Sequence, residues 1–392
     1  MKKSKNLKMK AVPFLSEENM KRFIYADNAA TTKLDDDAFE AMKPYLINEY
    51  GNPSQPYSFS RTCKKVLKDS RKIIADCINA QPEEIYFTSG GTESDNWAIK
   101  GSAFFDFTKR EILTSAIEHH AVLNACKAIE RLDYPVRYLS PNKYGIIVPE
   151  NLEKNITCRT RLVSVMLANN EIGTIEPIKE LALIAHQHGA MFHTDAVQAV
   201  GHIKIDVQKL GIDMLSASAH KFNGPKGIGF LYIRKKTDIL PYSDGGLQEF
   251  GMRAGTENVA AIVGMATALK KNCVKIDYNK EKLVYLENLL LDKLCGIKYI
   301  RNGYKEHIPG NLSLSFKDSD GEAILHRLDL KGICISTGSA CNSVNVQISH
   351  VIKAIKVPDE YAHGTIRISL GKNNTESDVI KIAEALCEVI NQ

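Results

Sequence analysis

The chain has 392 residues, of which 44% are hydrophobic and 25% charged, with a formal net charge of +5. This length and composition are typical of a globular protein with two domains. The small net charge gives no reason to expect a nucleic-acid partner, and no apolar run approaches the about 18 residues that a membrane span needs, so no membrane partner is expected.

The cysteines predict a reducing compartment. Nine of them are scattered along the chain with irregular spacing and no Cys-x-x-Cys pair. An odd number without a regular pattern favours neither a disulfide framework nor a zinc site, so we expect no metal ligands. A cytoplasmic location fits this pattern best.

The first 22 residues are polar, with lysines at 2, 3, 5, 8 and 10. We expect a mobile N-terminal extension, because the segment has no apolar periodicity. It also lacks the apolar core of a secretory signal. The small-residue stretch from Asp27 to Thr32 follows the first ordered-looking run and is suited to lining a pocket.

Apolar runs and helical segments then alternate, which predicts an α/β fold with helices on both faces of a mostly parallel, seven-stranded sheet. In such sheets ligands gather at the carboxyl ends of the strands. The expected strands are Glu84–Thr88, Glu111–Ser115, Val136–Leu139, Leu162–Leu167, Ala190–Thr194, Asp213–Ala217 and Ile228–Ile233.

After Gly255 the pattern changes to long helices, at about 257–272 and 280–295, followed by short strands and further helices. This predicts a second, smaller α/β domain. We therefore expect a large domain at 23–262, whose first residues pack against the small domain, and a small C-terminal domain at 263–392.

Lys221 is the residue around which the rest of the site is expected to gather. It follows an apolar strand and the polar residues Ser218 and His220, and a loop rich in glycine and proline comes next. A lysine at such a strand end is held by rigid elements yet open to a cleft.

A second motif predicts a phosphate site. Thr88 to Asp95 runs from a strand into a helix through Gly90 and Gly91, and we expect Thr92 and Asp95 to cap that helix. Free N–H groups and the helix dipole there suit a phosphate dianion. Ser218 and His220 could supply further donors.

Three other strand ends carry groups suited to a flat, nitrogen-containing ring. His119 could stack on the ring or pass a proton, although a purely capping histidine is equally compatible with the sequence. Asp195 ends a buried strand and needs a cationic partner, which a protonated pyridine nitrogen would provide. Asn170 and Gln198 offer amides nearby.

Taken together, these motifs resemble those of the cysteine desulfurases, a family of fold-type-I transferases that depend on pyridoxal 5'-phosphate. The similarity extends from about residue 23 to about residue 390. The matching motifs are 27–32, 88–94, 118–120, 169–173, 195–198, 218–221, 253–258, 337–341 and 366–371.

The resemblance implies a homodimer and a role for each residue. Lys221 would bind the cofactor covalently, and His119 would stack on its ring. Asp195 would pair with the pyridine nitrogen, and Gln198 with Asn170 would hold the ring hydroxyl. The phosphate would be bound by Gly91, Thr92, Ser218 and His220, and by Thr256 from the partner subunit. Arg367 would bind the carboxylate of the substrate L-cysteine, with Asn170 beside it.

The family also implies that Cys341, in a run of small residues, accepts the sulfur as a persulfide. The run resembles that of the long-loop group, which delivers sulfur to an acceptor protein such as an iron–sulfur scaffold or a thiolation enzyme. Glu257-Asn258 resembles the nitrogenase-associated type, and the chain ends at Gln392 without the tail of housekeeping members, so the acceptor stays open.

Two kinds of alternative remain. A selenocysteine lyase or another fold-type-I aminotransferase would share the cofactor residues but would have less use for Cys341. A catalytically inactive scaffold would be expected to have lost Lys221, Asp195 or Cys341, and the chain keeps all three.

Overall fold

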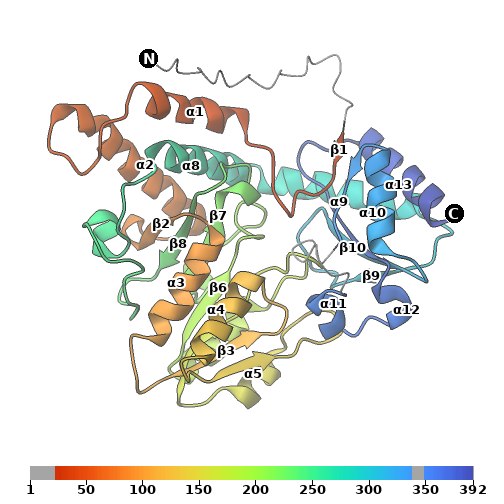
Figure 1. Ribbon diagram of the computed structural model, residues 1–392, viewed down its shortest axis with the longest axis horizontal. Coiled ribbons are helices and arrows are strands. Elements are labelled where there is room, and N and C mark those ends of the chain that lie inside the picture. Colours follow the sequence, from red (N-terminus) through yellow and green to blue (C-terminus); the bar gives the residue numbers. More distant parts are fainter. Residues whose placement is uncertain (1–22, 338–347, 392) are drawn as a thin grey trace, which may run out of the picture.

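The structure is a computed structural model that describes residues 23–337 and 348–391. Its centre is a large sheet (Figure 1), whose strands follow the hydrogen-bonded order β2-β8-β7-β6-β5-β3-β4. Neighbouring strands run parallel except at β8, which is antiparallel to both β2 and β7. The expected mostly parallel, seven-stranded sheet is thus confirmed. Its strands are β2 (Ile85–Thr88), β3 (Glu111–Ser115), β4 (Val136–Leu139), β5 (Thr160–Ser164), β6 (Met191–Asp195), β7 (Met214–Ser218) and β8 (Gly229–Ile233).

Helices cover both faces of this sheet because successive strand residues point to opposite sides. Leu162 and Met214 pack with Trp97 on the face covered by α3 (Gly91–Ala103) and α4 (His120–Glu130). Their neighbours Val163 and Leu215 pack on the other face. That face is covered by α2 (Arg61–Ile78), α6 (Ile178–Gln187) and α8 (Val259–Val274).

Further elements lie in the connections of the large sheet. They are α1 (Asp36–Ile47), η2 (Ser58–Ser60), η3 (Pro82–Glu84), α5 (Pro149–Asn155), α7 (Val207–Leu210), η4 (Ala219–Lys221) and η5 (Gln248–Gly251). Of these, η4 matters most for the site, because it turns the chain directly after β7 and carries Lys221.

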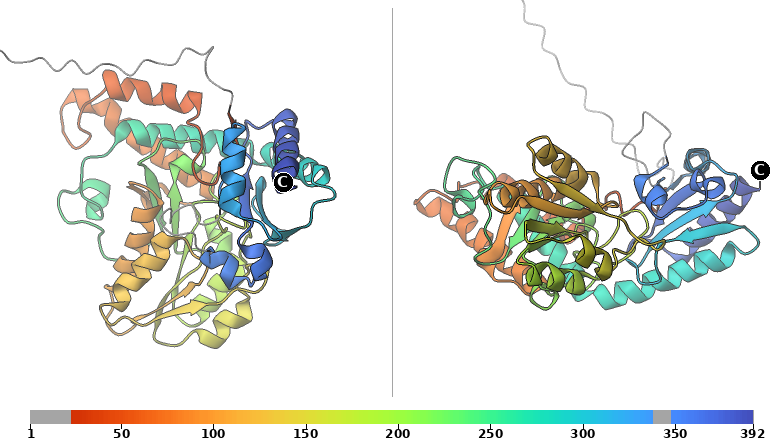
Figure 2. Two further views of the ribbon diagram at one scale, coloured as in Figure 1. Left: turned by 45° about the vertical axis from the view of Figure 1, so that its right-hand side comes forward. Right: turned by 90° about the horizontal axis from the view of Figure 1, so that it is seen from below.

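A second, smaller sheet lies beside the first and has its own core, built around Leu286, Phe316, Ile366 and Leu386 (Figure 2). It is antiparallel, with the order β12-β10-β9. Its strands and helices are β9 (Tyr299–Asn302), β10 (Asn311–Phe316), β12 (Thr365–Ser369), α9 (Ile276–Lys293), α10 (Gly321–Leu330), α11 (His350–Ala354), α12 (Asp359–Ala362) and α13 (Glu376–Ile390).

The start of the described chain belongs to this smaller core. Strand β1 (Ile24–Tyr25) pairs in parallel with β11 (Ile333–Cys334), and Ile24 and Ala26 are buried in the same cluster as Phe316. Asp27 then forms a bridge with Ser369 at the end of β12. This pairing carries the stretch from Asp27 to Thr32 into the space between the two sheets. Among the residues that the structure describes, no helix is long and apolar enough to cross a membrane.

Candidate functional site

A cavity of about 580 Å³ opens at the carboxyl ends of the central strands. Its volume lies within the about 300–1,000 Å³ that is usual for small-molecule sites. Ten of the residues that the sequence assigned to a cofactor or substrate line it together: Gly91, Thr92, His119, Asn170, Asp195, Gln198, Ser218, His220, Lys221 and Arg367.

Two of the assigned residues are not among those lining the cavity. Thr256 lies in an exposed loop between η5 and α8. Cys341 lies outside the described residues, as do residues 1–22, so the expectations for both rest on the sequence alone.

Lys221 is held against the chain that enters between the two sheets. Its Nζ donates to the carbonyl oxygens of Ala29 (2.6 Å) and Ala30 (2.8 Å). Gln198 Nε2 donates to the same carbonyl of Ala29, at 2.9 Å. The motif at 27–32 therefore does line the pocket, and it fixes the position of the lysine head group.

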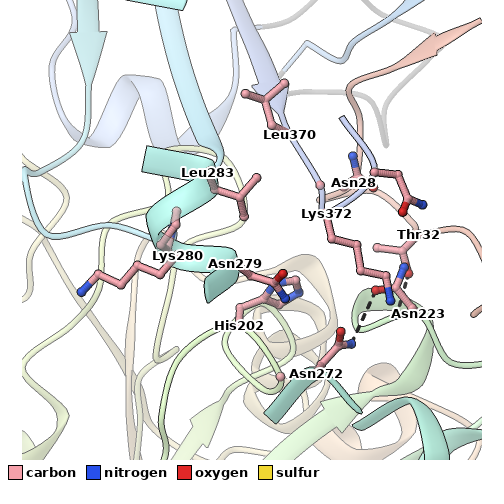
Figure 3. Close-up of a pocket in the computed structure, with 14 residues that line it drawn as sticks. Asn28, Thr32, His202, Asn223, Asn272, Asn279, Lys280, Leu283, Leu370 and Lys372 are labelled. Atoms are coloured by element: carbon pink, nitrogen blue, oxygen red, sulfur yellow. Dashed lines mark hydrogen bonds between the residues drawn. The ribbon is translucent and has the colours of Figure 1, made fainter. Parts of the chain in front are cut away.

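A second, much smaller cavity is lined by polar side chains that include His202, Asn223 and Asn272 (Figure 3). Two of these side chains contact the backbone of the Lys221 turn. His202 Nε2 lies 2.9 Å from the main-chain oxygen of Lys221. Asn272 Nδ2 donates to the carbonyl of Phe222 at 2.6 Å, and Asn223 Nδ2 donates to that of Lys33 at 2.9 Å. The sequence did not identify His202 or Asn272, because each comes from a connection or helix whose local pattern says nothing about contact with Lys221.

At the other end of the cavity, helix α3 begins with glycines that leave its first turn open. Gly90 has a φ of +149°, and a Cβ on Gly91 would lie 2.6 Å from Val197 Cγ2. The expected capping pair of Thr92 and Asp95 is wrong: the N-cap is Gly90, and no side chain of the described chain caps the helix. The first-turn N–H groups are therefore left available for an anion, as a phosphate site requires.

Ser218 and His220 lie across from these glycines. A Cβ on Gly90 would lie 3.4 Å from Ser218 Oγ, so the serine hydroxyl is close to the start of α3. His220 Nδ1 lies 3.1 Å from Thr31 Oγ1. Burial lowers the pKa of His220 to about 4, so the imidazole is neutral at physiological pH and acts as a hydrogen-bonding group.

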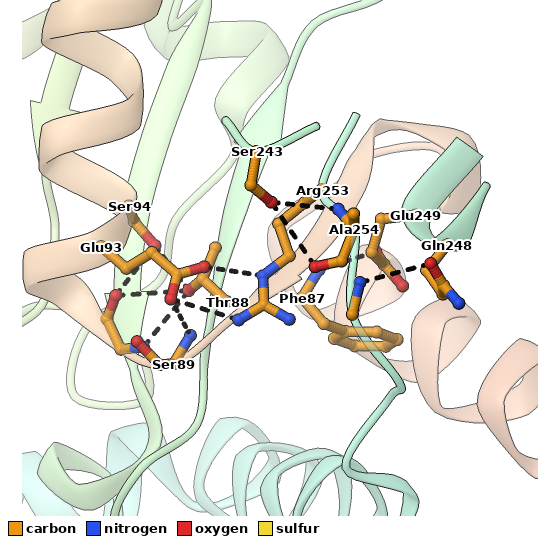
Figure 4. Close-up of polar contacts among 12 residues, drawn as sticks. Phe87, Thr88, Ser89, Glu93, Ser94, Ser243, Gln248, Glu249, Arg253 and Ala254 are labelled. Atoms are coloured by element: carbon orange, nitrogen blue, oxygen red, sulfur yellow. Dashed lines mark hydrogen bonds and ion pairs between the residues drawn. The ribbon is translucent and has the colours of Figure 1, made fainter. Parts of the chain in front are cut away.

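Two partly buried arginine–glutamate pairs fix the loop from Ser243 to Thr256 against the start of α3 and against β2. Figure 4 shows the first of them, between Arg253 and Glu93. Arg253 Nε lies 2.9 Å from Glu93 Oε1 on α3. Arg71 of α2 forms a bidentate pair with Glu249, at 2.7 Å for each contact, and Glu249 also accepts from Phe87 N at 2.8 Å. The loop that carries Thr256 is thereby held close to the phosphate end of the cavity.

The ring end of the cavity has Asp195 on one side and His119 on the other. Asp195 is the last residue of β6 and is 5% exposed, and its Oδ1 accepts from Val197 N at 2.9 Å. Burial raises its pKa, whereas the nearby charges of His119 and Lys221 lower it. A buried carboxylate of this kind is stabilised by a cation such as a protonated ring nitrogen.

His119 serves as a helix cap and lines the cavity at the same time. It is the N-cap of α4, and its Nδ1 accepts from Ala121 N at 3.1 Å, so a neutral ring carries its proton on Nε2. Burial is the main cause that lowers its pKa. The sequence left capping and cofactor contact as alternatives, and the geometry is compatible with both together.

Arg367 is the candidate binder of a carboxylate. Its Nη1 donates to the carbonyl of Asn170 at 2.9 Å, and its Nη2 lies 2.7 Å from Asp27 Oδ1. Its Nε is buried without a hydrogen-bond partner among the described residues. An unpaired buried donor on a charged group is costly, and a carboxylate ligand would offset that cost.

Comparison with known proteins agrees with this geometry. The model of the family described as "Aminotransferase class-V" matches residues 24–382. The chain is 47% identical over 377 residues to cysteine desulfurase IscS of Dictyoglomus turgidum, covering 95% of this chain and 96% of that protein. It is also 47% identical over 381 residues to cysteine desulfurase IscS of Methanosarcina thermophila, covering 96% and 94% of the two chains.

Solved structures give the same result. A "NifS-like protein" superposes with a TM-score of 0.89 at 36% identity, covering 94% of this chain and all of the other. A structure described as "SspA in complex with cysteine" superposes with a TM-score of 0.80 at 35% identity, covering 90% of this chain and all of the other.

The fold and the site thus define a pyridoxal-phosphate enzyme of fold type I. More specifically, the chain belongs to the class-V aminotransferase family, and its resemblance to the cysteine desulfurases is confirmed. The residues present fit the cofactor. The open first turn of α3 suits its phosphate, the buried Asp195 suits its ring nitrogen, and Lys221 can bind it covalently.

Proposed function

We propose that this protein is a cysteine desulfurase, which converts L-cysteine to L-alanine and transfers the sulfur to a thiol of its own. The observation that carries the proposal is the cavity that brings Lys221, Asp195 and Arg367 together in a chain with cysteine desulfurases among its relatives. The carboxylate of an amino acid and the ring of the cofactor would find complementary groups at opposite walls of this cavity.

In this proposal the chain holds the cofactor at three points. The first-turn N–H groups of α3, together with Ser218 and His220, bind the phosphate. Asp195 pairs with the ring nitrogen, and His119 lies against the ring. When bound, pyridoxal phosphate supplies an electron-withdrawing ring that stabilises negative charge on the substrate α-carbon.

The substrate carboxylate is bound by Arg367, whose unpaired Nε–H supplies the open donor. A guanidinium suits this task because its fork of donors matches a carboxylate. Lys221 Nζ, or alternatively His119 Nε2, moves the α-proton. Both side chains line the same cavity as Arg367.

Cys341 is proposed to take the sulfur. Its thiolate attacks the substrate sulfur, so that a sulfur–sulfur bond forms as the carbon–sulfur bond of cysteine breaks. The electron pair of the broken bond stays with the carbon, which is then protonated. L-Cysteine and the thiol of Cys341 thus give L-alanine and a Cys341 persulfide, which passes its terminal sulfur to an acceptor protein such as an iron–sulfur scaffold or a thiolation enzyme.

The test is to supply L-cysteine with a reductant and to measure L-alanine and sulfide together. A desulfurase yields both in equal amounts. An aminotransferase yields neither sulfide nor alanine from cysteine alone, and instead consumes a keto acid. A selenocysteine lyase releases alanine from selenocysteine and leaves cysteine unchanged.

The proposal includes a homodimer. Large apolar side chains are exposed on the end of α1 and on the loop that carries Thr256, and these are Leu46, Ile47, Tyr50, Leu247 and Phe250. A second copy covering them would bring Thr256 to the phosphate of its partner. Leu247→Asp should then give a monomer with weakened cofactor binding in sedimentation analysis, whereas Leu330→Asp on α10 should not. A fully active wild-type monomer would contradict the dimer.

We also propose the division into a large and a small domain, with the boundary near Lys275 rather than at residue 262. The reason is that α8 packs in the core of the large sheet as far as Leu269, whereas α9 packs in the smaller core through Leu286 and Leu290. A cytoplasmic location accords with the described cysteines, all of which are free thiols.

A further inference from the structure

The floor of the cavity holds a second carboxylate that the proposed mechanism does not use. Asp95 lies on α3, about one turn after Gly91, and lines the cavity together with Asp195. Its side chain is 1% exposed, and its Oδ1 has no hydrogen-bond partner in the part of the chain that the structure describes. A buried carboxylate with an open oxygen beside a cofactor site requires an explanation.

The neighbours of Asp95 come from the sheet face beneath α3. His193 and Asp195 are two residues apart on β6, so they point to the same face. The strand register pairs Ser164 of β5 with His193, and Ser216 of β7 with Asp195. Neighbouring strands of a sheet lie about 5 Å apart. Ser216 therefore lies directly beside Asp195.

Hydrogen bonds link these side chains to Asp95. Ser164 Oγ lies 2.8 Å from His193 Nδ1, and His193 Nε2 lies 3.0 Å from Ser216 Oγ. Ser216 in turn hydrogen-bonds the Asp95 carboxyl. The chain is complete if Ser164 donates to His193, His193 donates to Ser216 and Ser216 donates to Asp95.

His193 does not supply Asp95 with a cation, although its Nε2 is only 3.7 Å from Asp95 Oδ1. The imidazole is fully buried, and burial lowers its pKa to about 3. It is therefore neutral at physiological pH and acts only as a link between two hydroxyl groups.

The remaining titratable groups around Asp95 are acidic. Burial first, and then the charges of Asp195 and of Glu118 before α4, raise the pKa of Asp95 well above its ordinary value. Two buried carboxylates whose charges act on each other do not both ionise without a cation. Asp195 is the carboxyl whose pKa the neighbouring His119 and Lys221 lower, so we assign the negative charge to it.

We propose that Asp95 is a positioning residue that stays a neutral carboxylic acid, held by Ser216 and His193, and donates a hydrogen bond toward Asp195. Asp195 is then the single anion below the ring nitrogen of the cofactor, in one fixed orientation. Asp95 acts through Asp195 and does not itself contact the cofactor. This inference depends on the cofactor and not on the identity of the substrate.

The test compares two cofactors on the apo-protein: pyridoxal phosphate and its 1-deaza analogue, in which a C–H group replaces the ring nitrogen. Asp95→Ala should weaken the binding of pyridoxal phosphate about tenfold or more, the usual effect of losing a hydrogen bond to a charged group. It should change the binding of the analogue by less than about threefold, because the analogue makes no ion pair with Asp195.

Asp95→Asn should restore most of the affinity, because an amide is neutral and also donates. Asn96→Ala, next along α3 with its side chain bonded to the Thr92 carbonyl, is the matched control and should bind both cofactors like the wild type. The infrared difference spectrum of wild type minus Asp95→Asn at pH 8 should contain the carbonyl band of a protonated carboxyl group.

Three outcomes overturn the proposal. If Asp95→Ala lost affinity equally for pyridoxal phosphate and for the analogue, the residue would be merely structural. If Asp95→Asn bound pyridoxal phosphate as weakly as Asp95→Ala, a negative charge on Asp95 would be what supports cofactor binding. A difference spectrum without the acid band would mean that Asp95 is ionised, and this measurement holds even if Asp95→Ala fails to fold.

Discussion

Arg367 and Asp27 form a 2.7 Å ion pair although they are 340 positions apart in the sequence. Asp27 arrives from the short pairing of β1 with β11, and Arg367 stands on β12 of the smaller sheet. Asp27 and the Asn170 carbonyl each take one terminal nitrogen of the guanidinium, and the buried Nε is left without a partner in the described chain. The guanidinium is therefore held by two fixed acceptors, and its Nε donor is left over.

The first prediction concerns this arginine. Arg367→Lys keeps the charge but loses the Nε donor, so KM for L-cysteine should rise about tenfold or more while the cofactor stays bound. Steady-state kinetics and the cofactor absorbance spectrum measure the two effects. Arg327→Lys, in the same part of the chain but bonded to the Val389 carbonyl, is the control and should leave KM unchanged. An unchanged KM in Arg367→Lys would remove the carboxylate-binding role.

The second prediction concerns Lys221. Lys221→Ala should abolish covalent attachment of the cofactor and lower turnover by about three orders of magnitude or more, because the covalent handle and a proton carrier are lost together. Borohydride reduction followed by mass spectrometry should find the cofactor on Lys221 of the wild type and on no residue of the variant. Lys209→Ala, an exposed lysine on α7, should behave like the wild type. Normal turnover in Lys221→Ala would refute its assigned role.

The third prediction separates cofactor chemistry from sulfur transfer. Cys341→Ala should still bind the cofactor, still show a spectral change with L-cysteine and still exchange the α-proton, yet form neither alanine nor persulfide. Mass spectrometry of the wild type after L-cysteine treatment should show one added sulfur on the peptide that contains Cys341. The exposed Cys158 offers a control, and Cys158→Ala should remain active. Alanine formation at the wild-type rate in Cys341→Ala would favour a lyase that needs no protein thiol.

The fourth prediction concerns pH and stability. Glu118 is fully buried, and burial raises its pKa to about 8 despite hydrogen bonds from Ser115 and Met166 N. Because the folded-state pKa lies above the unfolded value, the neutral carboxyl contributes stability in full below the unfolded pKa. That contribution is lost as pH rises toward 8.

Glu118→Gln should therefore be more stable than the wild type at pH 8, with a free energy of unfolding higher by up to about 4 kcal/mol. At pH 5 the difference in the free energy of unfolding should be much smaller. Urea denaturation of the apo-protein at both pH values measures this, and the exposed Glu150→Gln should show no such dependence. The same gain at pH 5 and pH 8 would contradict ionisation of Glu118 as the cause.

The sequence predicted most of the architecture because the seven central strands are short apolar runs bounded by helices with clear periodicity. It also predicted ten of the residues that line the cavity. Most of them are polar groups at the carboxyl ends of the large sheet's strands, which meet at one edge of that sheet, whereas Arg367 of the smaller sheet was predicted only through the family resemblance. Strand ends were displaced by a few residues: β5, expected at 162–167, is Thr160–Ser164. The hydrophobic run continues past Ser164. Val165 N and Leu167 N still donate to the carbonyl oxygens of His193 and Asp195, so the end of this strand depends on where regular pairing is taken to stop.

Other features were decided only by tertiary contacts. Local pattern suggested that Thr92 and Asp95 cap α3, but the sheet face beneath α3 holds Asp95 through Ser216, and the helix starts on Gly90 without a side-chain cap. His202 reaches the Lys221 turn from a connection, and Asn272 reaches it from helix α8. Asp27 meets Arg367 only because β1 pairs with β11. The sequence by itself determined which groups stand at the strand ends, because strand period and topology are local and repetitive. Their protonation states and supporting hydrogen bonds were decided by burial and by long-range neighbours, which exist only in the folded chain.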